Sequence, residues 1–403
     1  MIPFSPPRID QKIIDEVTKA LKSGWITTGP RTKQFEKLVT AYCGNKTTVA
    51  LNSATAGLEL MLRWFGIGEG DEVILPAYTY CATANVVIHC GAKPVFVDVN
   101  KDDFNISINE IRKAINEKTK VIMPVDFAGM PCDYTQINQM VSTPNIQKLF
   151  IPKGDNQQKL GRILILSDAA HSFGGIYNGK TTGSLTDVTV FSFHAVKNLT
   201  TAEGGAIALN LPTPFDNEEI YKELCIVSLH GQNKDALAKT QKGNWRYDVI
   251  TAGFKCNMTD ICAAIGLVEI DRYKDDTLVK RKEIFDKYAE KFTSYTWAEL
   301  PIYNTYEKTS SYHLFPLRIK GISEDQRDLI IQKIFDKEVA VNVHFIPVPK
   351  LSFYASLGYN FNDYPVAMDN YSREISLPVY YDLSDENLKD VSNAVLEAVE
   401  SVI

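Results

Sequence analysis

The chain has 403 residues, 45% of them hydrophobic and 23% charged, which is typical of a globular protein large enough for more than one core. Its net charge of −6 argues against the basic face that general nucleic-acid binders and membrane-surface proteins need. No stretch reaches the roughly 18 apolar residues of a membrane helix, and the N-terminus lacks the pattern of a signal peptide. We therefore expect a cytoplasmic protein that binds neither nucleic acid nor membrane. The seven cysteines include no Cys-x-x-Cys pair, so we expect reduced thiols and no metal site.

The hydrophobic pattern alternates between strands and helices from residue 47 onward. Before that point, apolar residues three and four apart predict helices at 8–23 and 32–42. Strands are expected at 48–51, 72–75, 94–97, 120–124, 163–167, 189–192 and 205–208, with helices at 56–65, 82–89 and 109–115. This alternation is typical of an α/β fold whose mostly parallel sheet is covered on both faces. The polar run 152–160 interrupts the pattern and is interpreted as a surface insertion.

The pattern changes again near residue 255. A long helix is expected from 260 to about 292, and an extended segment follows at 312–319. Further helices are expected near 324–335 and at 384–402. We therefore predict a large domain over residues 1–255 and a smaller α+β domain over residues 256–403.

Lys197 lies in the densest polar cluster, which runs from Phe191 to Gly205 and reads FSFHAVKNLTTAEGG. A strand is expected to end at Ser192, so Lys197 falls just past its carboxyl end, the edge of an open α/β sheet where ligands bind. A partly desolvated lysine has a lowered pKa and can attack an aldehyde to form an imine. The alternative is an ordinary lysine in a surface loop.

Asp168 ends the apolar run that begins at Ile163. A carboxylate at the end of a buried strand is costly unless it meets a cation, and a protonated pyridine nitrogen is such a cation. The alternative is a helix N-cap. His171 follows three residues later and could face the same ring, although a structural histidine is nearly as good an interpretation.

Small residues join the strand at 48–51 to the next helix. Backbone N–H groups at the start of that helix could approach a phosphate, although Ser and Thr are also common simply as helix caps. Tyr78 and Tyr80 follow the next strand and could stack on a flat ring, although aromatic residues at strand ends are more often part of the core.

In order along the chain, the motifs SATA, PAYTYCATAN, SDAAHSFG and FSFHAVKNLTTAEGG closely resemble those of the DegT/DnrJ/EryC1/StrS aminotransferases. The resemblance covers nearly the whole chain. It implies a pyridoxal 5′-phosphate (PLP) enzyme of fold type I, which aminates keto sugars carried on nucleotides. The spacing of Asp168 and Lys197 leaves room for one strand between them, as in that family.

The resemblance also assigns roles to individual residues. Lys197 would form the Schiff base and move a proton, Asp168 would pair with the ring nitrogen, and His171 would lie close to the ring. The remaining contacts implied are Tyr80 on the ring face; Ala54, Thr55 and Ser192 at the phosphate; Asn257 at the phosphate of a neighbouring subunit; and Trp25, Gly29, His344 and Phe345 on the substrate side. An obligate homodimer with shared active sites follows from the role of Asn257.

The predicted reaction moves an amino group from L-glutamate to a nucleotide-linked keto sugar, at C4 of a UDP- or dTDP-4-keto-6-deoxy sugar. The chain departs from the family in having Val348-Pro349-Lys350 where a second histidine is frequent, and in the long polar run at 152–160. A branch of the family that removes a hydroxyl has histidine in place of the lysine, so Lys197 favours amination. The alternatives are a PLP enzyme acting on another substrate, such as a keto-cyclitol, and a non-catalytic regulator.

Overall fold

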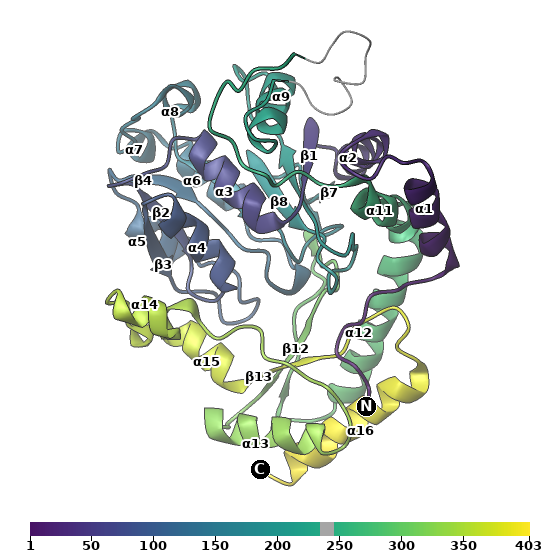
Figure 1. Cartoon of the computed structure of the whole chain (residues 1–403). Helices are drawn as coiled ribbons and strands as arrows, with labels where there is room; N and C mark the ends of the chain where they lie inside the picture. The colour runs from purple at the N-terminus through teal and green to yellow at the C-terminus, as the bar shows by residue number, and fades with distance from the viewer. Residues whose placement is uncertain (234–245) are drawn as a thin grey trace.

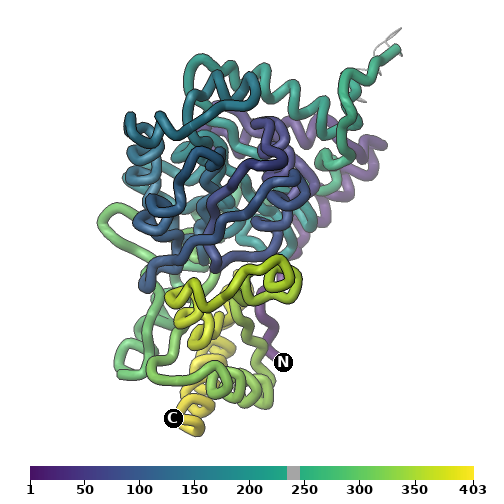
Figure 2. The backbone as a smooth tube through the Cα atoms, turned by 90° about the vertical axis from the view of Figure 1, so that its left-hand side faces the viewer, coloured from purple at the N-terminus to yellow at the C-terminus, as the bar shows by residue number. Residues whose placement is uncertain are grey.

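The computed structural model describes residues 1–233 and 246–403. Figure 1 shows a larger upper part built around a central sheet and a smaller lower part that contains β12, β13, α13 and α16. The side view in Figure 2 shows the same division and places both chain termini in the smaller part. Among the helices of the described residues, none is long and apolar enough to cross a membrane.

The central sheet has seven strands in the order β1-β9-β8-β5-β4-β2-β3. They are β1 (Thr47–Leu51), β2 (Glu72–Pro76), β3 (Lys93–Val97), β4 (Thr119–Ile122), β5 (Leu164–Asp168), β8 (Val188–Ser192) and β9 (Gly205–Leu209). From β3 to β8 every pairing is parallel, and β9 runs antiparallel to both β8 and β1. The predicted mostly parallel sheet is therefore confirmed. Most of its strands are buried along their whole length, which explains their continuous apolar sequences.

The larger part contains ten helices among the described residues. They are α1 (Gln11–Lys22), α2 (Pro30–Cys43), α3 (Ala54–Trp64), α4 (Cys81–His89), α5 (Ile108–Ala114), α6 (Tyr134–Val141), α7 (Pro144–Gln147), α8 (Asp155–Leu160), α9 (Asn217–Val227) and α11 (Asp260–Arg272). In Figure 1, α3 and α4 cross in front of the strands, and α1, α2 and α11 lie together at the right. Two hydrophobic clusters hold these helices on the sheet, and α2 and α11 belong to the smaller of the two.

The predicted insertion at 152–160 forms helix α8 on the surface. One of its side chains, that of Gln157, is fully buried, and its amide donates to the carbonyl oxygen of Phe65 at 3.0 Å. Because this bond joins α8 to the end of α3, the segment is packed against the larger part, although its sequence is polar.

The smaller part is a three-stranded antiparallel sheet with helices against it. Its strands lie in the order β10 (Ala298–Glu299), β12 (Phe315–Ile319), β13 (Glu374–Leu377), and its helices are α12 (Leu278–Phe292), α13 (Glu324–Phe335) and α16 (Asp385–Glu400). Short helices α14 (Ser352–Ser356) and α15 (Pro365–Arg373) instead contribute to the large cluster of the upper part. A second small sheet joins β11 (Lys308–Thr309) to β6 (Ile176–Tyr177) and β7 (Lys180–Thr181).

Packing changes within the long helix rather than at residue 255. Gly266 of α11 packs against the ring of Phe35 in the larger part. After the π-helical segment Tyr273–Thr277, α12 places Ile284 in the core of the smaller part. The N-terminal segment also joins the smaller part, because Ile2 pairs with Val339. The boundary between residues 255 and 256 stays a prediction about independent folding units.

Gly205 sits where β9 meets the start of α3, and we predict that Gly205→Ala destabilises the protein. A Cβ there would lie 2.4 Å from both the backbone nitrogen of Ala54 and the carbonyl carbon of Ser53. Backbone atoms cannot swing aside, so we expect a loss of about 1–3 kcal/mol in the free energy of unfolding. Gly68→Ala is the control, because the nearest atom to its Cβ would be 3.9 Å away. Equal midpoints of denaturant unfolding for both variants would contradict the prediction.

Candidate active site

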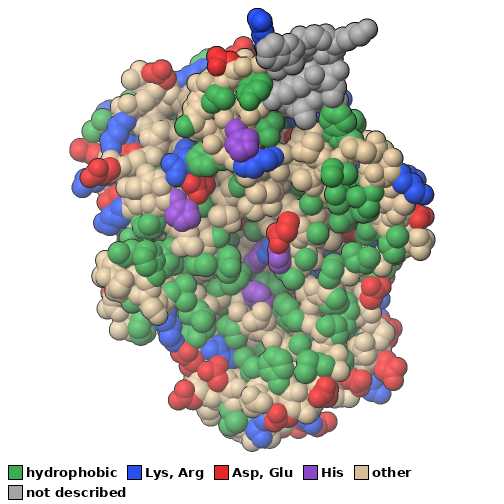
Figure 3. Space-filling model, viewed as in Figure 1, with side chains coloured by type: hydrophobic (Ala, Val, Ile, Leu, Met, Phe, Trp, Pro, Cys, Tyr) green, Lys and Arg blue, Asp and Glu red, His purple; other side chains and the backbone are tan. Residues whose placement is uncertain are grey.

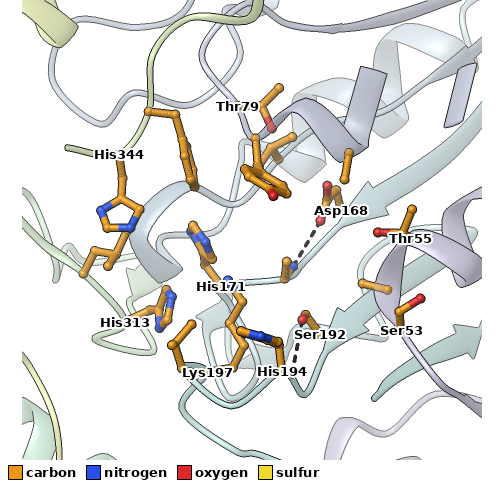
Figure 4. Close-up of a pocket in the computed structure, with 18 of the residues that line it drawn as sticks. Ser53, Thr55, Thr79, Asp168, His171, Ser192, His194, Lys197, His313 and His344 are labelled. Carbon is orange, nitrogen blue, oxygen red and sulfur yellow. Dashed lines mark hydrogen bonds between the residues drawn. The ribbon is translucent and has the colours of Figure 1, made fainter. Parts of the chain in front are cut away.

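A cavity of about 370 Å³ opens at the carboxyl ends of β5 and β8. In the space-filling view, histidine side chains are visible in the hollow at the middle of the molecule (Figure 3). Nine of the twelve predicted site residues line it: Ala54, Thr55, Tyr80, Asp168, His171, Ser192, Lys197, His344 and Phe345. The fold therefore gathers residues from five separate stretches of the chain in one place (Figure 4). Their individual roles stay predictions.

Lys197 lies in a tight loop between β8 and β9. Its backbone N–H donates to the carbonyl oxygen of His194 at 2.9 Å, and the N–H of Thr201 closes the loop onto Phe193 O at 2.8 Å. Burial lowers the pKa of Lys197 to about 8, although the negative charge of Asp168 raises it. The unprotonated amine, the form that can attack an aldehyde, is therefore far more populated near neutral pH than in an ordinary lysine, although the protonated form still predominates.

Asp168 is buried at the end of β5, and its carboxylate is held on both oxygens. Oδ2 accepts from the hydroxyl of Thr83 at 2.8 Å, and Oδ1 accepts from the N–H of Ala170 at 3.2 Å. Burial raises the pKa of Asp168, whereas these hydrogen bonds and the charge of Lys197 lower it. The helix N-cap alternative is wrong, because a turn leading to β6 follows Asp168.

One strand of the central sheet, β8, separates Asp168 from Lys197 along the chain, as the spacing predicts. The short strands β6 and β7 also lie between them, in the second small sheet outside the central one. Because β5 and β8 are hydrogen-bonded neighbours, their carboxyl ends bring the two side chains to the same cavity.

His171 is a buried imidazole in the wall of the cavity. Its ring stacks on Phe345, with centroids 5.7 Å apart, and lies 4.3 Å from the ring of His313. Burial, followed by the charge of Lys197, holds the pKa of His171 well below its usual value, so the ring is neutral. Its Nδ1 atom is buried and has no hydrogen-bond partner among the described residues.

His344 and Phe345 come from the loop before α14 and form another wall. The backbone carbonyl of His344 accepts from the hydroxyl of Tyr78 at 2.6 Å. The two tyrosines of the sequence motif are thereby distinguished, because Tyr78 is buried in the core whereas Tyr80 lines the cavity and is 60% exposed. The ring of Tyr80 lies 5.8 Å from that of Phe345. Burial and the charge of Lys197 lower the pKa of His344 to about 3.

The start of helix α3 forms the end of the cavity near Ser192. Ser53 caps the helix by accepting from the N–H of Ala56 at 3.1 Å. The N–H groups of Ala54 and Thr55, in the first turn, have no intrahelical partner and can bind an anion. Gly205 allows β9 to pack directly against this turn. The arrangement is suited to a phosphate group.

Three predicted site residues lie outside the lining of the cavity: Trp25, Gly29 and Asn257. They gather around Thr28, whose hydroxyl accepts from the Asn257 side chain at 2.5 Å and whose carbonyl accepts from Trp25 Nε1 at 3.1 Å. Asn257 also pairs with Leu51 at the end of β1, just before the start of α3. The structure therefore brings these three residues together, outside the lining of the cavity of their own chain but, through Asn257, beside the segment that leads into α3.

Sequence reasoning missed Thr83, Asn198 and His313. His313 lines the cavity and shares a hydrogen bond of 2.8 Å with the side chain of Asn198, the residue after Lys197. His313 lies inside the extended segment predicted at 312–319, just before the observed β12, and carries no local signal of a site residue. Asn198 and Thr83 both lie within the motifs given above, but the sequence does not show that Thr83 contacts Asp168 or that Asn198 contacts His313.

Comparison with known proteins agrees with this geometry. The sequence profile of the DegT/DnrJ/EryC1/StrS aminotransferase family matches residues 7–150 and 156–396. The chain belongs to this family. The break at 151–155 falls at the start of the polar run that we interpret as an insertion. PLP is the cofactor of these aminotransferases, so the predicted cofactor is confirmed along with the family.

Relatives match over almost their whole length. An uncharacterised protein of Methanocaldococcus jannaschii is 39% identical, and the spore coat polysaccharide biosynthesis protein SpsC of Bacillus subtilis is 36% identical; both alignments cover 99% of this chain and 97% of the relative. Among solved structures, Spr1654 of Streptococcus pneumoniae, assigned as a sugar aminotransferase, matches in its PMP form with a TM-score of 0.96 at 46% identity over 100% of both chains. PseC of Helicobacter pylori, an aminotransferase involved in pseudoaminic acid biosynthesis, matches at 27% identity with a TM-score of 0.85 over 99% of both.

The residues of the cavity fit PLP. The buried carboxylate of Asp168 suits a protonated ring nitrogen, and the first turn of α3 suits the phosphate. The amine of Lys197 is the group that can bond to the aldehyde. The unpartnered Nδ1 of His171 leaves a polar contact for a bound ring.

We predict that Lys197→Ala keeps the fold and loses turnover. Without the amine, the enzyme has no group to bond to the cofactor or to move the proton, so the rate should fall at least about 10²–10⁴-fold. Steady-state transamination assays with circular dichroism check both parts. Lys222→Ala, an exposed lysine on α9, is the control and should keep full activity. Normal turnover by Lys197→Ala would refute the assignment.

We predict that Asp168→Asn weakens cofactor binding and activity together. Removing one partner of a buried charge pair costs about 3–5 kcal/mol, so affinity for PLP should fall by about 10²-fold or more. Titration of the cofactor-free variant with PLP measures this loss. The exposed Asp390→Asn on α16 is the matched control. Unchanged affinity would remove the proposed pairing of Asp168.

Proposed function

We propose that the chain transfers an amino group from L-glutamate to a nucleotide-linked keto sugar, at C4 of a UDP- or dTDP-4-keto-6-deoxy sugar. The observation that carries the proposal is that the amine of Lys197 and the carboxylate of Asp168 share one cavity with a helix N-terminus. PLP, when bound, would withdraw electrons from the substrate carbon that carries the amino nitrogen. The side chains around the cofactor bind it, orient it and move the proton.

Asp168 keeps the pyridine nitrogen protonated. Thr83 and the N–H of Ala170 hold its two oxygens, so the carboxylate has a fixed orientation in the cavity. The first turn of α3, with Ser192 beside it, anchors the phosphate end. These contacts would hold PLP at its ring nitrogen and its phosphate, in the same cavity as the amine of Lys197.

Lys197 moves the proton between the cofactor and the substrate carbon. With a pKa of about 8, the amine can both take up and release a proton near neutral pH. His171, His313 and His344 are neutral because burial lowers the pKa of each, so they do not compete with Lys197 as cations. The same lysine serves both half-reactions, first with glutamate and then with the keto sugar.

The sugar assignment is supported by the relatives. SpsC is a spore coat polysaccharide biosynthesis protein, and PseC is an aminotransferase involved in the biosynthesis of pseudoaminic acid. Polysaccharide biosynthesis is accordingly the proposed role of this chain. His344 and Phe345 line the part of the cavity that we assign to the sugar.

We also propose that the enzyme is a homodimer with shared active sites. Trp25, Gly29 and Asn257 lie together outside the cavity of their own chain. We assign their contacts with substrate or phosphate to the cavity of a second subunit. The dimer would thereby give a role to predicted site residues that do not line the cavity of their own chain.

We predict that mass spectrometry will detect amination of a nucleotide-linked keto sugar. The enzyme is incubated with ¹⁵N-glutamate and a panel of UDP- and dTDP-linked 4-keto-6-deoxy sugars together with keto-cyclitols. The expected result is a ¹⁵N-labelled amino sugar nucleotide, whose aminated carbon is then located by NMR. Lys197→Ala is the inactive control. Labelling of a keto-cyclitol alone, or of nothing in the panel, would contradict the proposed substrate.

A further inference from the structure

Behind His344 lies a buried hydrogen-bonded chain that the proposed reaction does not use. Nδ1 of His344 lies 2.9 Å from the hydroxyl oxygen of Ser376, and that hydroxyl in turn contacts Oε1 of Glu374. Oε2 of Glu374 accepts from the backbone N–H of His344 at 3.0 Å. Glu374 and Ser376 are both completely buried on β13, whereas His344 lines the cavity. The chain thus links a buried carboxyl group to an imidazole that faces the substrate.

The number of protons on these three groups determines which nitrogen of His344 is protonated. Ser376 has a single hydroxyl proton, so it can donate to only one of its two neighbours. If Glu374 is ionised, Ser376 donates to it and Nδ1 of His344 must donate to Ser376. If Glu374 is protonated, its O–H donates to Ser376, Ser376 donates to Nδ1, and the proton of His344 is on Nε2.

We propose that Glu374 and Ser376 are positioning residues that set the tautomer of His344, so that the protonation state of Glu374 decides whether Nε2 donates to or accepts from the substrate. When Glu374 becomes protonated, one proton enters at Nε2 from the cavity, the Nδ1 proton passes to Ser376, and the Ser376 proton passes to Glu374. The proton count therefore balances. The inference rests on the proposed function only where it makes the sugar the partner of His344.

The surroundings favour the protonated acid near neutral pH. Burial raises the pKa of Glu374 to about 8, although its hydrogen bonds and the charges of Arg327 on α13 and Arg318 on β12 lower it. Tyr78 also faces this group, and burial holds its pKa well above the usual value, so it stays neutral. We therefore assign the Nε2–H form of His344 below about pH 8, which donates a hydrogen bond to an oxygen of the substrate.

His344 itself does not titrate in this range. Burial and the positive charge of Lys197 lower its pKa to about 3, and neighbouring His171 is likewise neutral. A change in the nitrogen signals of His344 above about pH 6 therefore reports the position of one proton rather than a change of charge on the ring.

The test is ¹⁵N NMR of the PLP-loaded enzyme with labelled histidine, recorded without substrate between about pH 6 and about pH 9.5. The chain has six histidines, and a spectrum of His344→Gln assigns the signal. The wild type should change from the Nε2–H to the Nδ1–H form with a midpoint near 8. Glu374→Gln, whose amide can donate to Ser376 but cannot ionise, should keep the Nε2–H form throughout.

Ser376→Ala interrupts the chain and should abolish the pH dependence of the His344 signal. It should also lower kcat/KM for the aminated substrate by about 10-fold, the effect of one lost hydrogen bond. Ser372→Ala is the matched control, because this half-buried serine near the end of α15 donates only to the backbone carbonyl of Asp369, and it should leave both unchanged. A wild-type signal that is constant with pH, or one that titrates identically in all variants, would overturn the inference. Because the NMR experiment needs no substrate, its failure is distinguishable from a failure of the proposed reaction.

Discussion

The structure depends on placing two opposite charges, those of Lys197 and Asp168, in one desolvated cavity. Burial disfavours both ions, lowering the pKa of the lysine and raising that of the aspartate, and each partly restores the charged form of the other. Burying two ionisable groups costs desolvation free energy unless each has a well-placed partner. PLP has a cationic ring nitrogen on one side and an aldehyde on the opposite side, so in the proposed site it would give the carboxylate and the amine a partner each.

The sheet determines where these groups meet. β5 and β8 are neighbours and parallel, so Asp168 and Ser192 end at the same edge. β9 turns back antiparallel beside β8, and its first residue, Gly205, allows the start of α3 to close against that edge. The carboxylate and the phosphate-binding turn are therefore fixed by strand pairing, whereas the amine of Lys197 depends on a loop, which its own hydrogen bonds make compact.

Much of the cofactor side could be predicted from the sequence, because its signals are local. Asp168 follows a continuous apolar strand, Lys197 follows the next central strand, and both lie in dense motifs. The sugar side could not be predicted to the same depth. His313 comes from just before β12 and lines the cavity, whereas Glu374 and Ser376 are buried on β13 and are connected to the cavity only through His344. These contacts arise from tertiary packing, so the sequence around each residue carries no signal of them. The polar run 152–160 predicts a surface insertion, and α8 lies on the surface. What its composition does not indicate is that the buried side chain of Gln157 anchors this helix, which has little apolar surface.

The histidines illustrate the same limit. Sequence patterns identify a histidine but not its charge, which here follows from burial next to Lys197. Neutral rings can serve as walls and as hydrogen-bonding groups without opposing the charge of the lysine. This property makes the tautomer of His344, rather than its protonation, the feature that the surrounding residues can control.

Reduction of the PLP-loaded enzyme with borohydride, followed by peptide mass spectrometry, tests the central claim most directly. Reduction makes the bond between the cofactor and its lysine permanent, so the modified peptide identifies the residue. The account predicts a phosphopyridoxyl group on Lys197 in the wild type and none in Asp168→Asn at cofactor concentrations that saturate the wild type. Modification of a different lysine in the wild type would contradict it.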